Sequence, residues 1–152
     1  KALEDLIRRG TEIGIRRFVF FEAERSERKP KPSDKWQRWA VDACKQCGRL
    51  WLPGFETRDT LAEVVEDASP DRLIALADPA APPLAQSLTG RDAIVLVGPE
   101  GDFTEEEITG ARERGFRTVS LGDAILRSEA AAIALVTLVR YHMGALGPPP
   151  GA

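Results

Sequence analysis

Arg127 is the residue whose type and position first suggest chemistry. It stands directly before Ser128-Glu129, where a helix is expected to begin, because serine is a good N-cap and glutamate favours the first turn. A cation beside a helix N-terminus is opposed by the helix dipole, by roughly 0.3–1 kcal/mol at an exposed site. A residue held against its local electrostatics is a candidate for a functional role.

A glycine-bearing loop earlier in the chain has a similar design. The segment 92–97 is typical of a buried strand and opens into Gly98-Pro-Glu-Gly-Asp-Phe103. Thr104 and Glu107 then form the capping-box pattern that starts a helix. The two glycines permit backbone conformations, or a close ligand approach, that a side chain would forbid. An ordinary strand-to-helix turn is the alternative for such a glycine pair taken alone.

Strands and helices that alternate along the chain must position these two loops. Periodicity and turn residues predict helices at 2–12, 33–48, 104–114 and 128–143, strands at 18–21, 72–77, 92–97 and 117–121, and a short helix at 82–88. This order predicts an α/β fold with a mostly parallel open sheet and helices on both faces. Ligands bind such sheets at the carboxyl ends of the strands, so the loops after the last three strands are expected to be neighbours.

The final helix is apolar on nearly every face. From Ala130 to Val139 only Thr137 is polar, so we expect protein to enclose this helix on nearly all sides. The chain of 152 residues is 43% hydrophobic, which indicates one globular domain. No apolar run is long enough to span a membrane and no leader segment is recognisable, so a cytoplasmic protein without a membrane partner is expected.

Cys44 and Cys47 form a C-x-x-C pair inside the expected helix 33–48. Such a pair suggests redox chemistry or a metal when a second pair or a nearby histidine completes it. The only histidine, His142, is distant in sequence, so Cys and His cannot complete a four-ligand zinc site. A structural role is therefore favoured for both cysteines, and no metal is expected.

The two loops, in this order, resemble a known family. V-G-P-E-G-D-F-T-x-x-E-I and L-G-D-A-I-L-R-S-E-A-A are similar to the signature of the bacterial 16S ribosomal RNA uridine N3-methyltransferase family, in the SPOUT superfamily. The blocks Glu12-Ile13-Gly14, Glu24-Arg25-Ser26 and Ala43 to Arg49 agree with it. The resemblance covers residues 1–143. Its departures are Asp102 for a second glycine, Ser128 for threonine and Ile13 for leucine.

The resemblance implies a fold and an activity. The expected fold is a SPOUT methyltransferase domain at 1–143 with a C-terminal trefoil knot, the final helix passing through a loop formed by roughly 92–120. The expected function is S-adenosylmethionine-dependent methylation of N3 of a uridine in 16S ribosomal RNA, by a homodimer that acts on this RNA or on the small ribosomal subunit. Residues 144–152 are expected to be a disordered tail. In this family a β-barrel RNA-binding domain usually precedes the catalytic domain, and we expect none within these 152 residues, which are either a fragment or a protein that dispenses with that module.

The resemblance also assigns residues to roles. Arg127 is the expected catalytic residue, placed next to the methyl group. The expected cofactor-binding residues, which act mainly through their backbone, are Leu76, Ala77, Val97, Gly98, Pro99, Glu100, Gly101, Leu121, Gly122, Ile125 and Leu126. No general base is obvious, and Glu100 and Glu129 are candidates for which a capping or structural role is the alternative.

The charge is divided unevenly and favours one end of the chain for RNA. The net charge is −3, yet residues 1–54 hold 13 Lys and Arg against 8 Asp and Glu. The expected RNA-binding residues in this part are Arg25, Arg28, Lys29, Lys31, Gln46 and Arg49. A merely solvated loop is the alternative for the basic segment 25–38.

Two other readings of the function remain open. A SPOUT ribose 2′-O RNA methyltransferase would share the fold and the cofactor. A non-catalytic RNA- or anion-binding module could use the helix N-terminus after Gly101, although the carboxylates of Glu100 and Asp102 would repel an anion there. No G-x-G-x-x-G occurs, so a Rossmann cofactor site is not supported.

Overall fold

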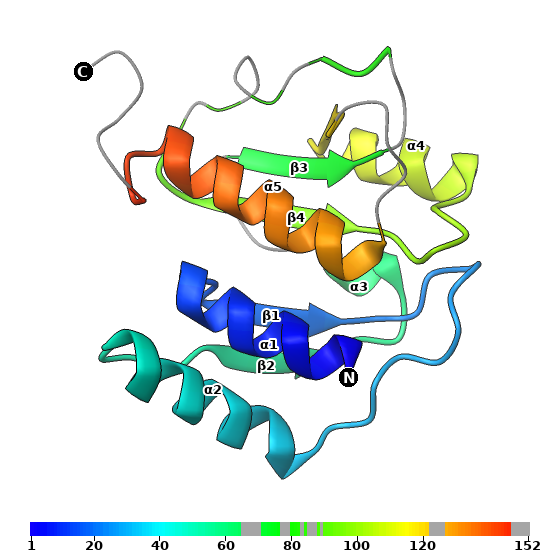
Figure 1. Cartoon of the computed structure of the whole chain (residues 1–152). Helices are drawn as coiled ribbons and strands as arrows, with labels where there is room; N and C mark the ends of the chain where they lie inside the picture. Colours follow the sequence, from blue (N-terminus) through cyan, green and yellow to red (C-terminus); the bar gives the residue numbers. More distant parts are fainter. Residues whose placement is uncertain are drawn as a thin grey trace.

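The computed structural model is an α/β fold (Figure 1) that describes residues 1–64, 71–76, 80–82, 84, 88, 90–121 and 127–146. In chain order, the elements are α1 (Ala2–Ile13), β1 (Arg17–Phe20), α2 (Asp34–Cys47), β2 (Gly54–Thr57), α3 (Leu61–Val64), β3 (Asp71–Ala75), β4 (Ala93–Val97), α4 (Glu105–Glu113), β5 (Arg117–Val119) and α5 (Ser128–His142).

Every strand pairing among the described residues is parallel. β1 pairs with β2, and β3 lies between β4 and β5 in a second group of three strands. The buried Asp71 carboxylate at the start of β3 accepts hydrogen bonds from the Arg117 guanidinium at 2.7 Å and from the Gly90 amide at 2.7 Å. Charged hydrogen bonds thus fix the amino ends of β3 and β5 beside each other.

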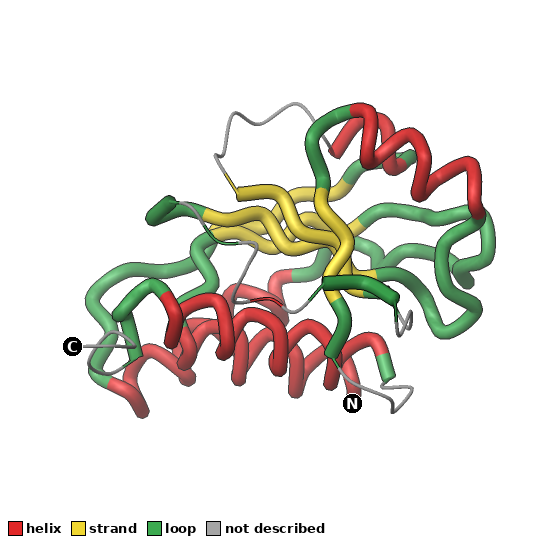
Figure 2. The backbone as a smooth tube through the Cα atoms, turned by 90° about the horizontal axis from the view of Figure 1, so that it is seen from above, coloured by secondary structure: helices red, strands yellow, loops and turns green. Residues whose placement is uncertain are grey.

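Helices cover both faces of the β3 group, as the sequence predicts (Figure 2). Ile74 of β3 packs on one face in a cluster with Ile108 of α4, whereas its neighbour Leu73 packs on the other face in a cluster with Leu135 of α5. This alternation follows from the two-residue period of a strand. A third cluster packs α1 and α2 against the aromatic rings of β1 and β2.

The predicted long helices and strands are confirmed, and each end differs from the observed end by at most two residues. Strand 72–77 is observed at Asp71–Ala75, with Ala77 outside the described residues, and strand 117–121 ends at Val119. Most of the expected short helix 82–88 also lies outside the described residues. The predicted capping box of α4 is present, because Thr104 Oγ1 accepts from the Glu107 amide and the Glu107 carboxylate accepts from the Thr104 amide.

One expectation about the last helix is wrong and another is left open. The N-cap of α5 is Arg127 and not Ser128, and Ser128 is the first helical residue. Its hydroxyl donates instead to the Gly98 carbonyl at 2.6 Å, so a tertiary hydrogen bond overrides the local capping preference. Within this single chain, Leu138 is 40% exposed and Tyr141 45% exposed, so enclosure of the helix on nearly all sides requires a second chain and stays a prediction.

Candidate functional site

The carboxyl ends of β3, β4 and β5 meet at one edge. Ala75 is in register with Val97 of β4 and with Val119 of β5, so the chain leaves all three strands side by side. Leu76 continues the ladder, because its amide donates to the Val119 carbonyl at 3.1 Å. The structure therefore brings Leu76, the segment 97–101 and Leu121 to a common edge, as the sequence analysis expects.

The loop after β4 is a tight turn with one unusual residue. The Asp102 amide donates to the Pro99 carbonyl at 2.8 Å, and Asp102 adopts a left-handed conformation with φ of 62°. Its own carboxylate accepts from the next amide, that of Phe103, at 2.8 Å. A left-handed backbone favours glycine, which explains why the resembling family has glycine here, and a local hydrogen bond helps aspartate to adopt it.

The two glycines of this loop are needed for packing against the protein itself. Neither Gly98 nor Gly101 has a positive φ. A Cβ on Gly98 would come within 3.0 Å of the Phe103 ring, and a Cβ on Gly101 within 3.2 Å of Arg25 Cβ. Both positions are thus crowded by neighbouring side chains, which keeps the loop close to the core.

The segment after β1 holds the same loop from outside. Arg25 Nη1 donates to the Gly101 carbonyl at 3.2 Å, and the Glu24 amide donates to Glu107 Oε2 at 3.2 Å. The second carboxylate oxygen of Glu107 completes the capping box of α4. The contribution of Glu24 is not predicted by the sequence analysis. Two signals exist in the sequence: Glu24 belongs to a block that resembles the family, and the T-x-x-E pattern identifies Glu107 as a cap. Neither signal identifies the residue that the second oxygen of Glu107 binds.

Arg127 lies at the start of α5 and is exposed. Its side chain forms no hydrogen bond or ion pair with any residue that the structure describes, so it is not paired with Glu129. The bond from the next residue, Ser128, to the Gly98 carbonyl ties this helix start to the loop after β4. Arg127 is therefore held near the strand ends while its guanidinium remains free to contact a ligand.

Four of the expected cofactor residues cannot be placed, because Ala77, Gly122, Ile125 and Leu126 lie outside the described residues. Of the candidate bases, Glu100 is exposed and Glu129 is half-buried. Neither carboxylate forms a hydrogen bond within the described part of the chain. Both remain candidates by position alone.

The expected RNA-binding residues fall into two groups at opposite ends of α2. Arg25, Arg28, Lys29 and Lys31 precede its N-terminus, whereas Gln46 and Arg49 lie at its C-terminal end. One stretch of RNA contacting all six would therefore have to pass along this helix.

The basic group is only partly available to RNA. Arg28 and Lys31 are exposed, but Lys29 is bound to the Asp59 carboxylate and to the Arg58 carbonyl. The hydrogen bond with Asp59 raises the pKa of Lys29 and lowers the pKa of Asp59. Lys29 thus stabilises the loop before α3, and Arg28 and Lys31 are the free cations of this group.

One member of the cysteine pair, Cys44, is buried, and its thiol lies 3.3 Å from the Trp51 carbonyl. Burial raises the pKa of this thiol. A raised pKa disfavours the reactive thiolate. Within the described ranges, no group of three or more His, Cys, Asp or Glu residues is arranged to hold a metal ion.

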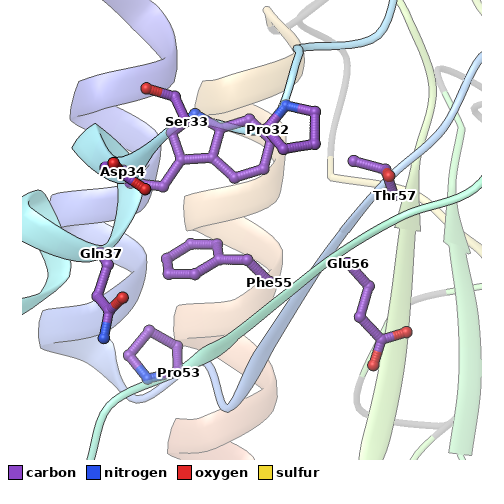
Figure 3. A pocket seen from close by; sticks show the side chains of 9 residues that line it. Pro32, Ser33, Asp34, Gln37, Pro53, Phe55, Glu56 and Thr57 are labelled. Atoms are coloured by element: carbon purple, nitrogen blue, oxygen red, sulfur yellow. The ribbon is translucent and has the colours of Figure 1, made fainter.

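An open pocket of ≈ 780 Å³ lies between the N-terminal turn of α2 and β2 (Figure 3). It is lined by Pro32, Ser33, Asp34, Trp36, Gln37, Pro53, Phe55, Glu56 and Thr57. None of these is an expected site residue. The ring centroids of Trp36 and Phe55 lie 5.8 Å apart, and these rings pack as part of the core. The carboxylates of Asp34 and Glu56 are among the lining groups. The pocket is therefore an unsuitable place for a phosphate backbone.

The edge at which β3, β4 and β5 end is called the strand-end site below. Loops cluster there at the carboxyl ends of the three parallel strands, and Arg127 lies beside them. This arrangement is typical of a ligand-binding α/β domain. In the described part, no helix is both long and apolar enough to cross a membrane.

The chain belongs to the RNA methyltransferase domain family, whose model matches residues 1–140. It is 29% identical over 143 residues to ribosomal RNA small subunit methyltransferase E of Aquifex aeolicus (strain VF5), covering 91% of this chain and 62% of that protein.

Two solved structures are similar in fold. A methyltransferase from Legionella pneumophila, solved with the bound cofactor SAM, superposes with a TM-score of 0.82 at 27% identity, covering 92% of this chain and 61% of that one. Ribosomal RNA small subunit methyltransferase E from Neisseria gonorrhoeae, bound to S-adenosyl methionine, superposes with a TM-score of 0.76 at 26% identity. The match covers 92% of this chain and 61% of that one. The chain thus spans about six tenths of the length of these relatives.

Proposed function

We propose that this chain is the catalytic part of an S-adenosylmethionine-dependent methyltransferase that methylates N3 of a uridine in 16S ribosomal RNA. The observation that carries the proposal is the meeting of three strand ends beside the free guanidinium of Arg127. Family membership and the names of the relatives support the reaction and the RNA substrate. Such a protein would work in the cytoplasm.

The residues at this edge suit S-adenosylmethionine. The carbonyls of Gly98 and Gly101 are bound by Ser128 and Arg25, whereas the amides of Glu100 and Gly101 form no hydrogen bond with another described residue. Backbone amides can recognise adenine or a carboxylate without a special side chain. We therefore assign cofactor binding to Leu76, the segment 97–101, Leu121 and, in the part that is not described, Ala77, Gly122, Ile125 and Leu126.

The reaction requires the N3–H bond of uracil to break and a bond from N3 to the methyl carbon to form. S-adenosylmethionine supplies the methyl group from its sulfonium, which becomes a thioether. As N3 loses its proton, negative charge develops on the imide. The fixed, planar charge of Arg127 would stabilise this charge, and Glu100 or Glu129 would accept the proton.

The path of the chain supports a trefoil knot as part of this proposal. β5 pairs with β3 on the side away from β4, yet α5, which follows β5, packs against β4. Ser128, at the start of α5, is bonded to Gly98 after β4, so this helix begins on the far side of β3 from β5. We propose that the final helix passes through the loop formed by roughly residues 92–120, within a SPOUT domain that spans residues 1–143.

The proposed function is tested by product analysis. The chain is incubated with a labelled methyl donor and small ribosomal subunits that lack the modification, and the digested nucleosides are separated by mass and retention. We expect 3-methyluridine. A 2′-O-methylated nucleoside would replace the proposal with the ribose-directed reaction, and binding of RNA without any labelled nucleoside would favour a non-catalytic module.

A further inference from the structure

Two arginines from different elements converge on the C-terminal turn of α1. Arg49 follows α2, and its Nε and Nη2 donate to the carbonyls of Thr11 and Glu12 at 3.0 and 2.9 Å. Arg140 belongs to the last turn of α5, and its guanidinium lies over Gly14 so closely that a Cβ there would come within 2.7 Å of Arg140 Cζ. Figure 1 shows that α1 and α5 end at the same side of the molecule.

The charge of Arg140 is not neutralised by this chain. Its Nε is buried without a hydrogen-bond partner, and within the described ranges its guanidinium forms no ion pair. Burial lowers the pKa of Arg140, and the positive charges of Arg49 and Arg16 lower it further. The carbonyls at the C-terminus of α1 attract cations, but those of Thr11 and Glu12 are already bound by Arg49. A half-buried cation among like charges gains when an anion binds.

An aromatic surface adjoins these arginines. The Arg49 guanidinium stacks on the Trp51 ring, with Cζ 4.7 Å from the ring centroid, and Trp51 is 37% exposed. The flanking Leu50 and Leu52 are exposed as well. Guanidinium planes match phosphate groups, and exposed aromatic or guanidinium faces stack on nucleobases.

We propose that Arg16, Arg49 and Arg140, with Trp51 beside them, form a site that binds the phosphate backbone of single-stranded RNA. The inference rests on the proposed function for the identity of the polyanion. The site is separate from the strand-end site, because thirteen residues of α5 separate Arg140 from Arg127, or about 20 Å along a helix. It therefore holds RNA that flanks the reacting base and not the base itself.

The test measures binding of oligouridine to the full chain over a range of salt concentrations. The variants are Arg140→Gln, Arg16→Gln and Trp51→Ala, and the charge-matched control is Arg112→Gln, an exposed arginine at the end of α4. We expect each of the first two to weaken binding at low salt by about fivefold and to lower the salt slope by about 0.7, the value for one lost phosphate contact. Trp51→Ala should weaken binding at least about fivefold with the slope unchanged.

Sedimentation and S-adenosylmethionine affinity are measured for every variant, and both should equal those of the wild type. The proposal is overturned if oligouridine does not bind the wild type, or if Arg140→Gln and Arg16→Gln match the Arg112→Gln control. It is also overturned if Arg140→Gln changes the sedimentation coefficient without changing RNA binding, because a carboxylate of a second copy would then be the anion. Methyl transfer by the wild type tests the proposed function separately. If no methyl transfer is detected, the comparison of RNA binding between the variants still tests the proposed RNA site.

Discussion

At the scale of single residues, the role of a side chain depends on whether it is bonded within the chain or remains available to a ligand. Ser128 is typical of a cap by its residue type, yet its hydroxyl binds the loop after β4. Lys29 belongs to a basic segment, yet it is paired with Asp59. Arg127 stands at a helix start that disfavours a cation, and its guanidinium forms no bond with a described residue. Residue type therefore suggests a role, and the contacts decide between alternatives.

Arg127→Ala should abolish most methyl transfer while the fold is retained. The side chain is exposed and forms no bond with a described residue, so the free energy of unfolding should change by less than about 0.5 kcal/mol. Loss of one aimed charge should slow single-turnover methylation by about a hundredfold to a thousandfold. Arg127→Lys should restore only part of the rate, because an ammonium lacks the planar donor pair. Near-normal turnover in Arg127→Ala would remove this residue from the catalytic site.

Replacing Asp102 tests whether the left-handed conformation in the loop after β4 lowers the stability of the chain. Asp102→Ala keeps the left-handed conformation but loses the bond from the carboxylate to the Phe103 amide, so it should destabilise the chain by about 1–2 kcal/mol. Asp102→Gly loses the same bond and relieves the backbone strain, so it should be nearly neutral. Chemical denaturation of both variants gives the comparison. Equal stability of the two would show that the left-handed conformation carries no cost here.

Arg28 and Lys29 are neighbours whose replacements should differ. Arg28→Ala should weaken RNA binding and leave melting unchanged, because Arg28 is exposed and forms no bond with a described residue. Lys29→Ala should lower the melting temperature, since it removes the contacts to Asp59 and to the Arg58 carbonyl. Thermal melting and filter binding of RNA distinguish the two. A lower melting temperature in Arg28→Ala would mean that the basic segment is structural throughout.

At the scale of elements, the site depends on short segments that brace the loop after β4 from three directions. α5 reaches it through Ser128, the segment after β1 reaches it through Arg25, and α4 reaches it through its capping box. These bonds join parts of the chain that lie far apart in sequence. Removing any one of these bonds should therefore shift the loop after β4 and lower the affinity for the cofactor.

Glu107→Ala should both destabilise the chain and weaken cofactor binding. It removes the acceptor for the Thr104 amide and the acceptor for the Glu24 amide, so we expect a loss of about 1–2 kcal/mol and a lower affinity for S-adenosylmethionine. Glu106→Ala is the matched control, because Glu106 is exposed in the same first turn of α4. Calorimetric titration and denaturation are the measurements. Unchanged cofactor affinity in Glu107→Ala would show that the cap does not position the loop.

At the scale of the whole molecule, one surface lacks a covering element. Leu138, Tyr141 and Leu146 at the end of the chain are 40%, 45% and 40% exposed, on and after a helix that is apolar nearly all round. Large apolar side chains exposed near one another in sequence suggest an interaction site. We infer that a second copy covers it, which agrees with the dimer that the family resemblance implies.

Replacing Leu138 by Glu should shift the chain toward a monomer. A charge placed in an apolar contact loses hydration without gaining a partner, so association should weaken by at least about tenfold. Thr109→Glu is a suitable control, because Thr109 is exposed on α4, which packs on the opposite face of β3 from α5. Sedimentation at micromolar concentration decides the question. A wild-type chain that sediments as a stable monomer would contradict the dimer.

The sequence by itself determined the order of elements, the parallel α/β class and the two loops that carry the site. These follow from local signals: hydrophobic period, capping residues and glycine positions such as Gly98 and Gly101. The family resemblance added the expected cofactor and an expected catalytic role for Arg127, which stays a prediction. Local patterns suffice for these features because each depends on residues within one or two turns of the chain.

Only the tertiary structure decided which groups meet across the chain. The bond from Ser128 to Gly98, the contact of Arg25 with Gly101 and the convergence of Arg49 and Arg140 on the end of α1 join residues tens of positions apart. No local pattern encodes such pairings, because they depend on how parallel strands and their covering helices pack. The partner of a side chain, and hence its availability to a ligand, is fixed by that packing and not by its neighbours in sequence.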